Sequence, residues 1–175
     1  MNNMKIIKKI AILLSLICFT TGCDHVYNIL LINKSNKSIY VFSPELIYDI
    51  DIYPDTVLPI GIVRYDDNIM YGSDSTHIIY ESLSGWYHSF SKKDTVSIYI
   101  FDNDNIDLYS WDSVINKNLI LQRYDLGFED VNGLCISNNY VSLLHFPPTE
   151  QMKHIHMWPP YGTYDENGQK KSNKK

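Results

Sequence analysis

Residues 94–102 have the sequence Asp-Thr-Val-Ser-Ile-Tyr-Ile-Phe-Asp, and this stretch decides the fold. Val96, Ile98 and Ile100 alternate with Tyr99 and Phe101, so a strand here carries large apolar side chains on both of its faces. A strand of this kind has to be covered on both faces to remove those side chains from water. We therefore expect residues 94–102 to form the central strand of a sheet.

The neighbouring segments also favour strands. Residues 26–33 and 38–42 are rich in β-branched and aromatic residues and flank the polar stretch 34–37, an arrangement that predicts a β-hairpin. Weaker strand candidates are each bounded by Asp, Asn, Gly or Pro, and they occupy residues 57–64, 77–82, 119–124 and 140–146.

Two short helices are predicted in the C-terminal half. The stretch 110–116 begins with Ser110, a favourable N-cap, and has Asp112 in its first turn, where the helix dipole favours negative charge. The stretch 128–132 has Glu129 and Asp130 early and is followed by Gly133.

We expect a mainly β fold: an antiparallel β-sandwich, Ig-like in general architecture, with one or two short helices inserted in the C-terminal half. The alternative is a single curved sheet packed on the short helices.

The N-terminus has the pattern of an export signal. Lys5, Lys8 and Lys9 form a positive region, and the apolar run 10–19 follows them. That run is about half of the roughly 20 residues that a membrane-spanning helix needs. It ends in Thr20, Thr21 and Gly22, small residues followed by Cys23, which is typical of a lipobox. We expect residues 1–22 to be a lipoprotein signal peptide and Cys23 to carry the acyl chains that bind membrane lipid.

Composition limits the partners of the mature chain. The signal peptide carries three lysines and no acidic residue, so the net charge of −5 becomes −8 after its removal. Phosphate contacts need clustered Lys and Arg. The basic cluster of the chain is Lys170, Lys171, Lys174 and Lys175, which we interpret as a solvated tail, so we expect no binding to nucleic acid. Cys135 is the one cysteine left besides Cys23, so no disulfide forms within the mature chain and apolar packing carries the stability.

The mature chain has the length of one domain, at residues 23–162. Its C-terminal part, 147–162, is a Pro-rich arm with Pro-Pro pairs at both ends, for which we expect an edge strand or an extended segment on the body. The polar residues 163–175 are expected to be a disordered tail.

Several sequence patterns contain residue types that are found in metal-binding or catalytic sites, but none of these patterns is complete. Asp102, Asp104 and Asp107 resemble a calcium loop, but the glycine and glutamate of an EF-hand are missing from their places. His145, His154 and His156 lack the spacing of a zinc site, and Cys135 has no base paired with it in the sequence. We expect no enzyme, no bound metal and no cofactor, and we interpret the acidic stretch as a solvated turn.

Aromatic residues are the better candidates for a binding site. Trp158, Trp86 and Trp111 could stack on sugar rings, which is one way in which β-sandwich modules hold polysaccharide. For Trp86 and Trp111 a place in the core is the favoured alternative, and Trp158 is the one for which we expect exposure.

Six segments of the chain together resemble those of a known protein family. They are the lipobox, the Asn33–Val41 stretch, the 94–102 strand, the Trp111 helix, the Arg123-Tyr-Asp125 segment and Phe146-Pro-Pro. The family is that of the small uncharacterised lipoproteins of Gram-negative gut anaerobes, which have no assigned activity. The family favours a serine where this chain has Gly127, at the start of the second helix. The resemblance implies a location in the cell envelope, in the outer membrane, with the periplasmic and surface faces both open.

The same resemblance implies O-glycosylation at Asp-Ser/Thr followed by an apolar residue or threonine. The matching residues are Thr56, Ser75, Thr95 and Ser113. The expected function is that of a membrane-anchored, non-catalytic accessory or binding module for a glycan or an envelope protein. The alternative is an envelope hydrolase or a metal-dependent enzyme.

Overall fold

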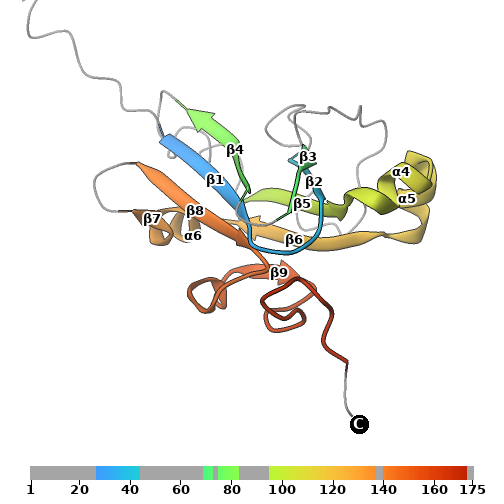
Figure 1. Ribbon diagram of the computed structural model, residues 1–175. Coiled ribbons are helices and arrows are strands. Elements are labelled where there is room, and N and C mark those ends of the chain that lie inside the picture. Colours follow the sequence, from blue (N-terminus) through green and yellow to red (C-terminus); the bar gives the residue numbers. More distant parts are fainter. Residues whose placement is uncertain (1–26, 44–68, 73–74, 83–94, 137–139, 173–175) are drawn as a thin grey trace, which may run out of the picture.

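The computed structural model describes residues 27–43, 69–72, 75–82, 95–136 and 140–172 (Figure 1). These residues form two β-sheets, three short α-helices and one 3-10 helix. The mainly β class and the sandwich are therefore confirmed. Among the described residues no helix is long and apolar enough to cross a lipid bilayer.

One sheet has four strands in the order β4-β1-β8-β7. Their bounds are β1 Tyr27–Asn33, β4 Ser75–Ser82, β7 Cys135–Ile136 and β8 Val141–Phe146. β1 pairs antiparallel with β4 and parallel with β8, so this sheet is mixed. The parallel pair is a departure from the antiparallel sandwich that the sequence predicts.

The other sheet has five strands, all antiparallel, in the order β3-β2-β5-β6-β9. Their bounds are β2 Ile39–Phe42, β3 Ile69–Met70, β5 Val96–Asp102, β6 Ile120–Leu126 and β9 His156–Trp158. β5 lies in the middle and is buried from Val96 to Phe101, as its two-faced apolar pattern predicts. β9 confirms the edge strand expected in the Pro-rich arm.

Alternate residues of β5 belong to two separate cores. Ile98 and Ile100 face the four-stranded sheet and share a core with Leu31, Leu144 and Phe146. Tyr99 and Phe101 lie on the opposite face, in a smaller aromatic core that includes Ile106 and Val114 of two helices. The five-stranded sheet is thus covered by a sheet on one face and by short helices on the other.

The helices are α4 Asn103–Leu108, α5 Trp111–Lys117 and α6 Phe128–Gly133, with the 3-10 helix η2 at Glu150–Met152. α5 and α6 confirm the two predicted helices. The hydroxyl of Ser110 accepts the Ser113 backbone N–H at 3.4 Å at the start of α5. α6 begins after Gly127 without a serine, because Asp130 accepts the Gly127 N–H at 2.8 Å.

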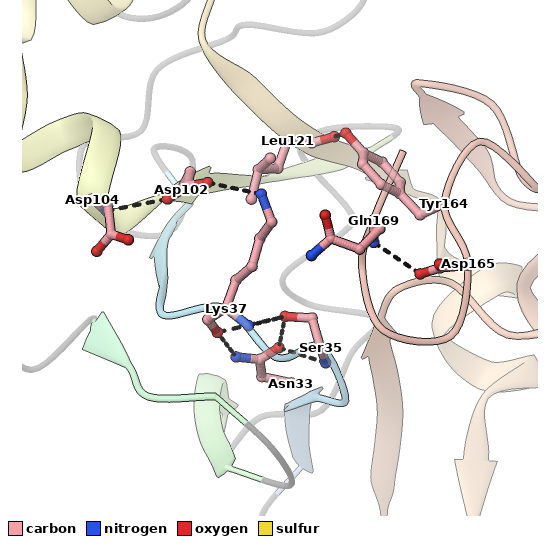
Figure 2. Close-up of polar contacts among 9 residues, drawn as sticks. All are labelled: Asn33, Ser35, Lys37, Asp102, Asp104, Leu121, Tyr164, Asp165 and Gln169. Atoms are coloured by element: carbon pink, nitrogen blue, oxygen red, sulfur yellow. Dashed lines mark hydrogen bonds and ion pairs between the residues drawn. The ribbon is translucent and has the colours of Figure 1, made fainter. Parts of the chain in front are cut away.

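The acidic stretch 102–107 was predicted as a turn, and this prediction is wrong, because α4 begins there. Asp102 is the N-cap of this helix and accepts the Asp104 backbone N–H at 3.2 Å. Its other oxygen pairs with the Lys37 ammonium at 3.0 Å. Asp102 therefore serves the fold: it starts a helix and fixes it to the β1–β2 connection (Figure 2).

The predicted hairpin at 26–42 is wrong as well, because β1 and β2 belong to different sheets. The connection between them is a polar turn in which Asn33 Oδ1 accepts the backbone N–H of Ser35 at 3.0 Å and its hydroxyl at 2.7 Å. Asn33 Nδ2 donates to the Lys37 carbonyl at 2.8 Å (Figure 2). These side chains satisfy the turn's backbone groups, so the chain can cross from one sheet to the other without a strand ladder.

The C-terminal residues 163–172 are ordered, which contradicts the expected disordered tail in that part. The Tyr164 hydroxyl donates to the Leu121 carbonyl at 2.6 Å, and its ring meets Phe146 edge-on at 5.7 Å. Gly168, at a φ of 76°, packs so closely on Ser35 that a Cβ there would lie 2.5 Å from the Ser35 Cβ. One half-buried tyrosine and one glycine thus attach a polar segment to the body. The predicted strand 57–64 lies outside the described residues.

Candidate functional site

The outer face of the five-stranded sheet carries polar residues near the edge formed by β9. Cross-strand partners share a face, and the register gives two rows there: Ser97, Asp125 and His156 in one, and Tyr99, Arg123 and Trp158 in the next. Three adjacent strands, β5, β6 and β9, each contribute one residue to each row. The site is therefore built by strand pairing.

Asp125 is the centre of this cluster. Its Oδ1 accepts the Ser97 hydroxyl at 2.8 Å and Arg123 Nε at 2.6 Å, and its Oδ2 lies 2.7 Å from His156 Nδ1. Asp125 and Arg123 are 2% and 4% exposed, whereas 70% of the His156 side chain is exposed. The cluster thus runs from a buried ion pair to an imidazole at the surface.

Aromatic stacking holds the buried cation in place. The Arg123 guanidinium lies over the Tyr99 ring, 5.3 Å from its centroid, a geometry that is favourable through the quadrupole of the ring. An arginine held by a carboxylate and an aromatic face has little freedom to move. Arg123 therefore serves as a rigid support for Asp125.

A pocket of about 340 Å³ opens beside the cluster. Its lining residues are Asn118, Ile120, Arg123, Asp125, His156, Met157 and Trp158. Trp158 is 44% exposed, which is high for so large an apolar side chain. The pocket therefore combines an accessible aromatic ring with polar groups, which is the usual composition of a small-molecule site.

The row of Ser97, Asp125 and His156 has the residue types of a catalytic triad in a different arrangement. In a triad the serine hydroxyl bonds to the histidine, whereas here the Ser97 hydroxyl donates to Asp125. Ser97 is also buried. The arrangement thus orients an imidazole and provides no seryl nucleophile, so its chemistry is hydrogen bonding and proton transfer at His156.

The three tryptophans that the sequence suggests as stacking residues lie in different parts of the chain. Trp158 lies at the pocket. Trp111 packs edge-on against Phe101 at 5.4 Å, and its buried indole N–H has no hydrogen-bond partner among the described residues. Trp111 is therefore partly buried against the aromatic core. Trp86 lies outside the described residues.

The three histidines considered as metal ligands have separate surroundings. His156 contacts Asp125, and His154 Nε2 lies 3.7 Å from Asp130. His145 is half-buried, and both burial and the nearby charge of Lys34 lower its pKa. Within the described part of the chain no three His, Cys, Asp or Glu side chains are grouped so as to hold a metal ion.

The residues predicted for O-glycosylation and lipidation, and the free cysteine, are not among the residues that line the pocket beside Trp158. The Ser113 hydroxyl is in α5, 3.0 Å from that of Ser110, Thr95 directly precedes β5, and Ser75 begins β4. Cys135 is a half-buried free thiol whose sulfur lies 3.7 Å from the Ile136 carbonyl oxygen. Thr56 and the lipidation residue Cys23 are outside the described residues.

A second, more open hollow of about 580 Å³ lies between the arm and the C-terminal segment. Tyr161 at its rim donates to Glu150 at 2.8 Å. Hydrogen bonds from Lys153 and Tyr161 lower the pKa of this fully exposed carboxyl.

The second hollow has Lys171 and Glu166 in its lining, so charges of both signs surround it. Its polar groups are less buried than Asp125 and Arg123, and the pocket at Trp158 is the better-built site.

Sequence reasoning missed Asp125 and His156 as a pair. The alternation within residues 120–126 places Arg123 and Asp125 on one face, and the same rule places His156 and Trp158 together. The pairing of β6 with β9 joins Asp125 to a residue 31 positions later, and no local pattern indicates that.

No protein-family model matches the chain, and no curated protein and no solved structure matches it either.

Proposed function

We propose that this protein is a membrane-anchored envelope lipoprotein whose β-domain binds a glycan in the pocket beside Trp158. The signal sequence and Cys23 support the anchor. The single observation that carries the binding proposal is the position of Trp158, half-exposed on an edge strand and next to a polar cluster.

A sugar ring has an apolar face of C–H groups and an edge of hydroxyls. Trp158 provides a flat apolar surface for the face, and His156 and Asn118 provide polar atoms in the same pocket. The volume of about 340 Å³ lies at the lower end of the roughly 300 to 1,000 Å³ of small-ligand sites. The pocket therefore fits one or two sugar units better than a protein surface.

The charge of the chain supports a ligand other than a polyanion. The mature chain has a predicted net charge of −8, and the guanidinium in the pocket, Arg123, is already paired with Asp125. A polyanion would meet repulsion from the acidic body, and the cation in the pocket is already neutralised by its carboxylate partner. A neutral or weakly charged glycan meets no such penalty.

A hydrolase is the second candidate, and the contact of 2.7 Å between Asp125 and His156 favours it. A carboxylate that orients an imidazole is the arrangement by which a histidine serves as a general base. Binding and hydrolysis differ in whether the ligand remains intact, so one experiment separates them.

The experiment applies the purified full chain to a glycan array and then incubates each bound glycan with the chain in solution. We expect binding to a defined set of glycans that chromatography recovers unchanged. Shortened or deacylated glycans that disappear with His156→Ala would favour the hydrolase. No binding across the array would contradict the glycan proposal.

A further inference from the structure

We infer that Asn118 forms a second sugar-binding position in the pocket beside Trp158, so that the pocket holds a glycan of at least two units. This inference rests on the proposed glycan function and names the ligand chemistry. One sugar ring stacks on Trp158, and the carboxamide of Asn118 hydrogen-bonds hydroxyls of the next unit. Asn118 is thus the residue by which the pocket distinguishes a disaccharide from a monosaccharide.

The pocket follows the outer face of β6. Ile120 packs against the aromatic core on that face, and Arg123 and Asp125 lie on the same face further along the strand. All three line the pocket, with Asn118 before the first of them and Trp158 paired with Arg123. Asn118 and Trp158 therefore lie at different points along β6, and α5 leads Asn118 to the end where β6 begins (Figure 1).

The separation along β6 is longer than one sugar ring. Ile120 and Arg123 are three residues apart, which is roughly 10 Å of extended strand, and Asn118 precedes Ile120 by two more residues. A single ring on Trp158, the partner of Arg123, does not extend over this length, whereas a second unit attached to that ring does. A glycan of two units therefore contacts both side chains.

The end of α5 fixes the backbone of Asn118. The Leu119 N–H donates to the Val114 carbonyl at 3.1 Å, which is the bond that closes a helix in a Schellman motif. Val114 is fully buried in the aromatic core, and Leu119 packs against the same core. Asn118 lies between these two anchored groups, so its backbone needs no ordering when a ligand binds its exposed side chain.

The residue type at this position favours a role besides the turn. Asn118 has a φ of 50°, and helices that end in this conformation usually have glycine there, since glycine has no Cβ to strain. Asparagine adopts it at some cost, and residues held in this backbone region cluster at functional sites. Its carboxamide has an acceptor and two donors. One sugar hydroxyl can thus donate to Oδ1 while its neighbour accepts from Nδ2.

The first measurement needs no ligand. Asn118→Gly removes the carboxamide and places the residue best suited to a positive φ at the end of α5. Urea denaturation of the full chain should therefore give a midpoint equal to that of the wild type or above it. A midpoint below that of the wild type would show that the carboxamide serves the turn, and would overturn the inference whatever the pocket binds.

The second measurement compares ligands by saturation-transfer NMR of the full chain. The probes are the methyl glycosides of glucose, galactose and mannose and those of cellobiose, lactose and mannobiose. We expect the disaccharides to bind the wild type more tightly. Asn118→Gly should weaken disaccharide binding about fivefold and leave monosaccharide binding unchanged. Trp158→Ala should weaken both. The control Asn116→Ala, which removes an exposed carboxamide of α5 outside the pocket lining, should weaken neither.

Two results would overturn the inference alone. They are disaccharide binding that is unchanged in Asn118→Gly, and binding that this variant weakens equally for both kinds of probe, while Trp158→Ala still weakens both. Binding of no probe to the wild type, or binding that Trp158→Ala leaves unchanged, would overturn the proposed function and this inference with it.

Discussion

Asp125 and His156 are register partners on β6 and β9, and Oδ2 of Asp125 lies 2.7 Å from Nδ1 of His156. The carboxylate is buried and the imidazole is exposed. This contact therefore links the interior of the five-stranded sheet to the pocket beside Trp158. The two residues have different roles, because Asp125 supports both the fold and the candidate site, whereas His156 belongs to the candidate site alone.

Asp125→Asn should lower the free energy of unfolding by about 3 kcal/mol, because it leaves the buried guanidinium of Arg123 without its carboxylate partner. His156→Ala should change it by less than about 1 kcal/mol, since that side chain is largely exposed and surface pairs contribute little. Urea denaturation of both variants measures the difference. Equal losses in the two variants would contradict this division of roles.

Tyr164→Phe should destabilise the chain by about 1 kcal/mol, because it removes the hydroxyl that donates to the Leu121 carbonyl at 2.6 Å. The matched control is Tyr161→Phe, which removes a hydroxyl from a fully exposed contact with Glu150 and should leave the stability unchanged. The midpoint of thermal unfolding measures both. A Tyr164→Phe chain as stable as the wild type would show that the C-terminal segment does not brace the body.

Stability should fall as the pH drops from about 7, in part because of His145. Burial, and secondarily the charge of Lys34, lower its pKa in the folded chain below the ordinary 6.5. The unfolded chain then binds a proton more readily, so the stabilisation is complete above pH 6.5 and is lost as the pH falls through the folded-state pKa. His145→Gln should flatten this part of the curve in denaturation at stepped pH. A slope identical in the two chains would exclude His145 as its source.

The central strand could be predicted because its pattern is local. Val96, Ile98 and Ile100 on one face and Tyr99 and Phe101 on the other require two covering layers, whatever those layers are. The β1–β2 connection could not be predicted in the same way, since a polar turn between apolar strands is equally compatible with a hairpin and with a crossing between sheets. The bonds of Asn33 and Ser35 decide between the two.

The candidate site shows the same limit. Trp158 could be selected from the sequence, because an aromatic residue next to Pro-Pro in an arm is placed near the surface. Arg123, Asp125 and His156 become a site only through the pairing of β5, β6 and β9. The contacts of Tyr164 with Phe146 and Leu121 could not be predicted, because the sequence neighbours of Tyr164 are polar and both partners lie far away along the chain.

The anchor proposal predicts that Cys23→Ser releases the protein from the membrane. Each buried methylene contributes about 0.8 kcal/mol, so loss of the acyl chains removes far more free energy than contacts of an acidic domain with anionic lipid could replace. Fractionation of the native host should find the variant soluble in the periplasm or the medium. Recovery in the membrane pellet after a high-salt wash, with the signal peptide removed, would show a second anchor.

The most direct test of the glycan pocket is calorimetric titration of an array-selected glycan into the wild-type chain, Trp158→Ala and Tyr71→Ala. Tyr71 is an exposed aromatic next to β3, the strand at the opposite edge of the same sheet. It therefore controls for loss of any surface aromatic. Loss of a stacking residue of this kind costs 1 kcal/mol or more, so Trp158→Ala should bind at least about fivefold more weakly, with Tyr71→Ala unchanged. Equal affinity of the wild type and Trp158→Ala would contradict the account.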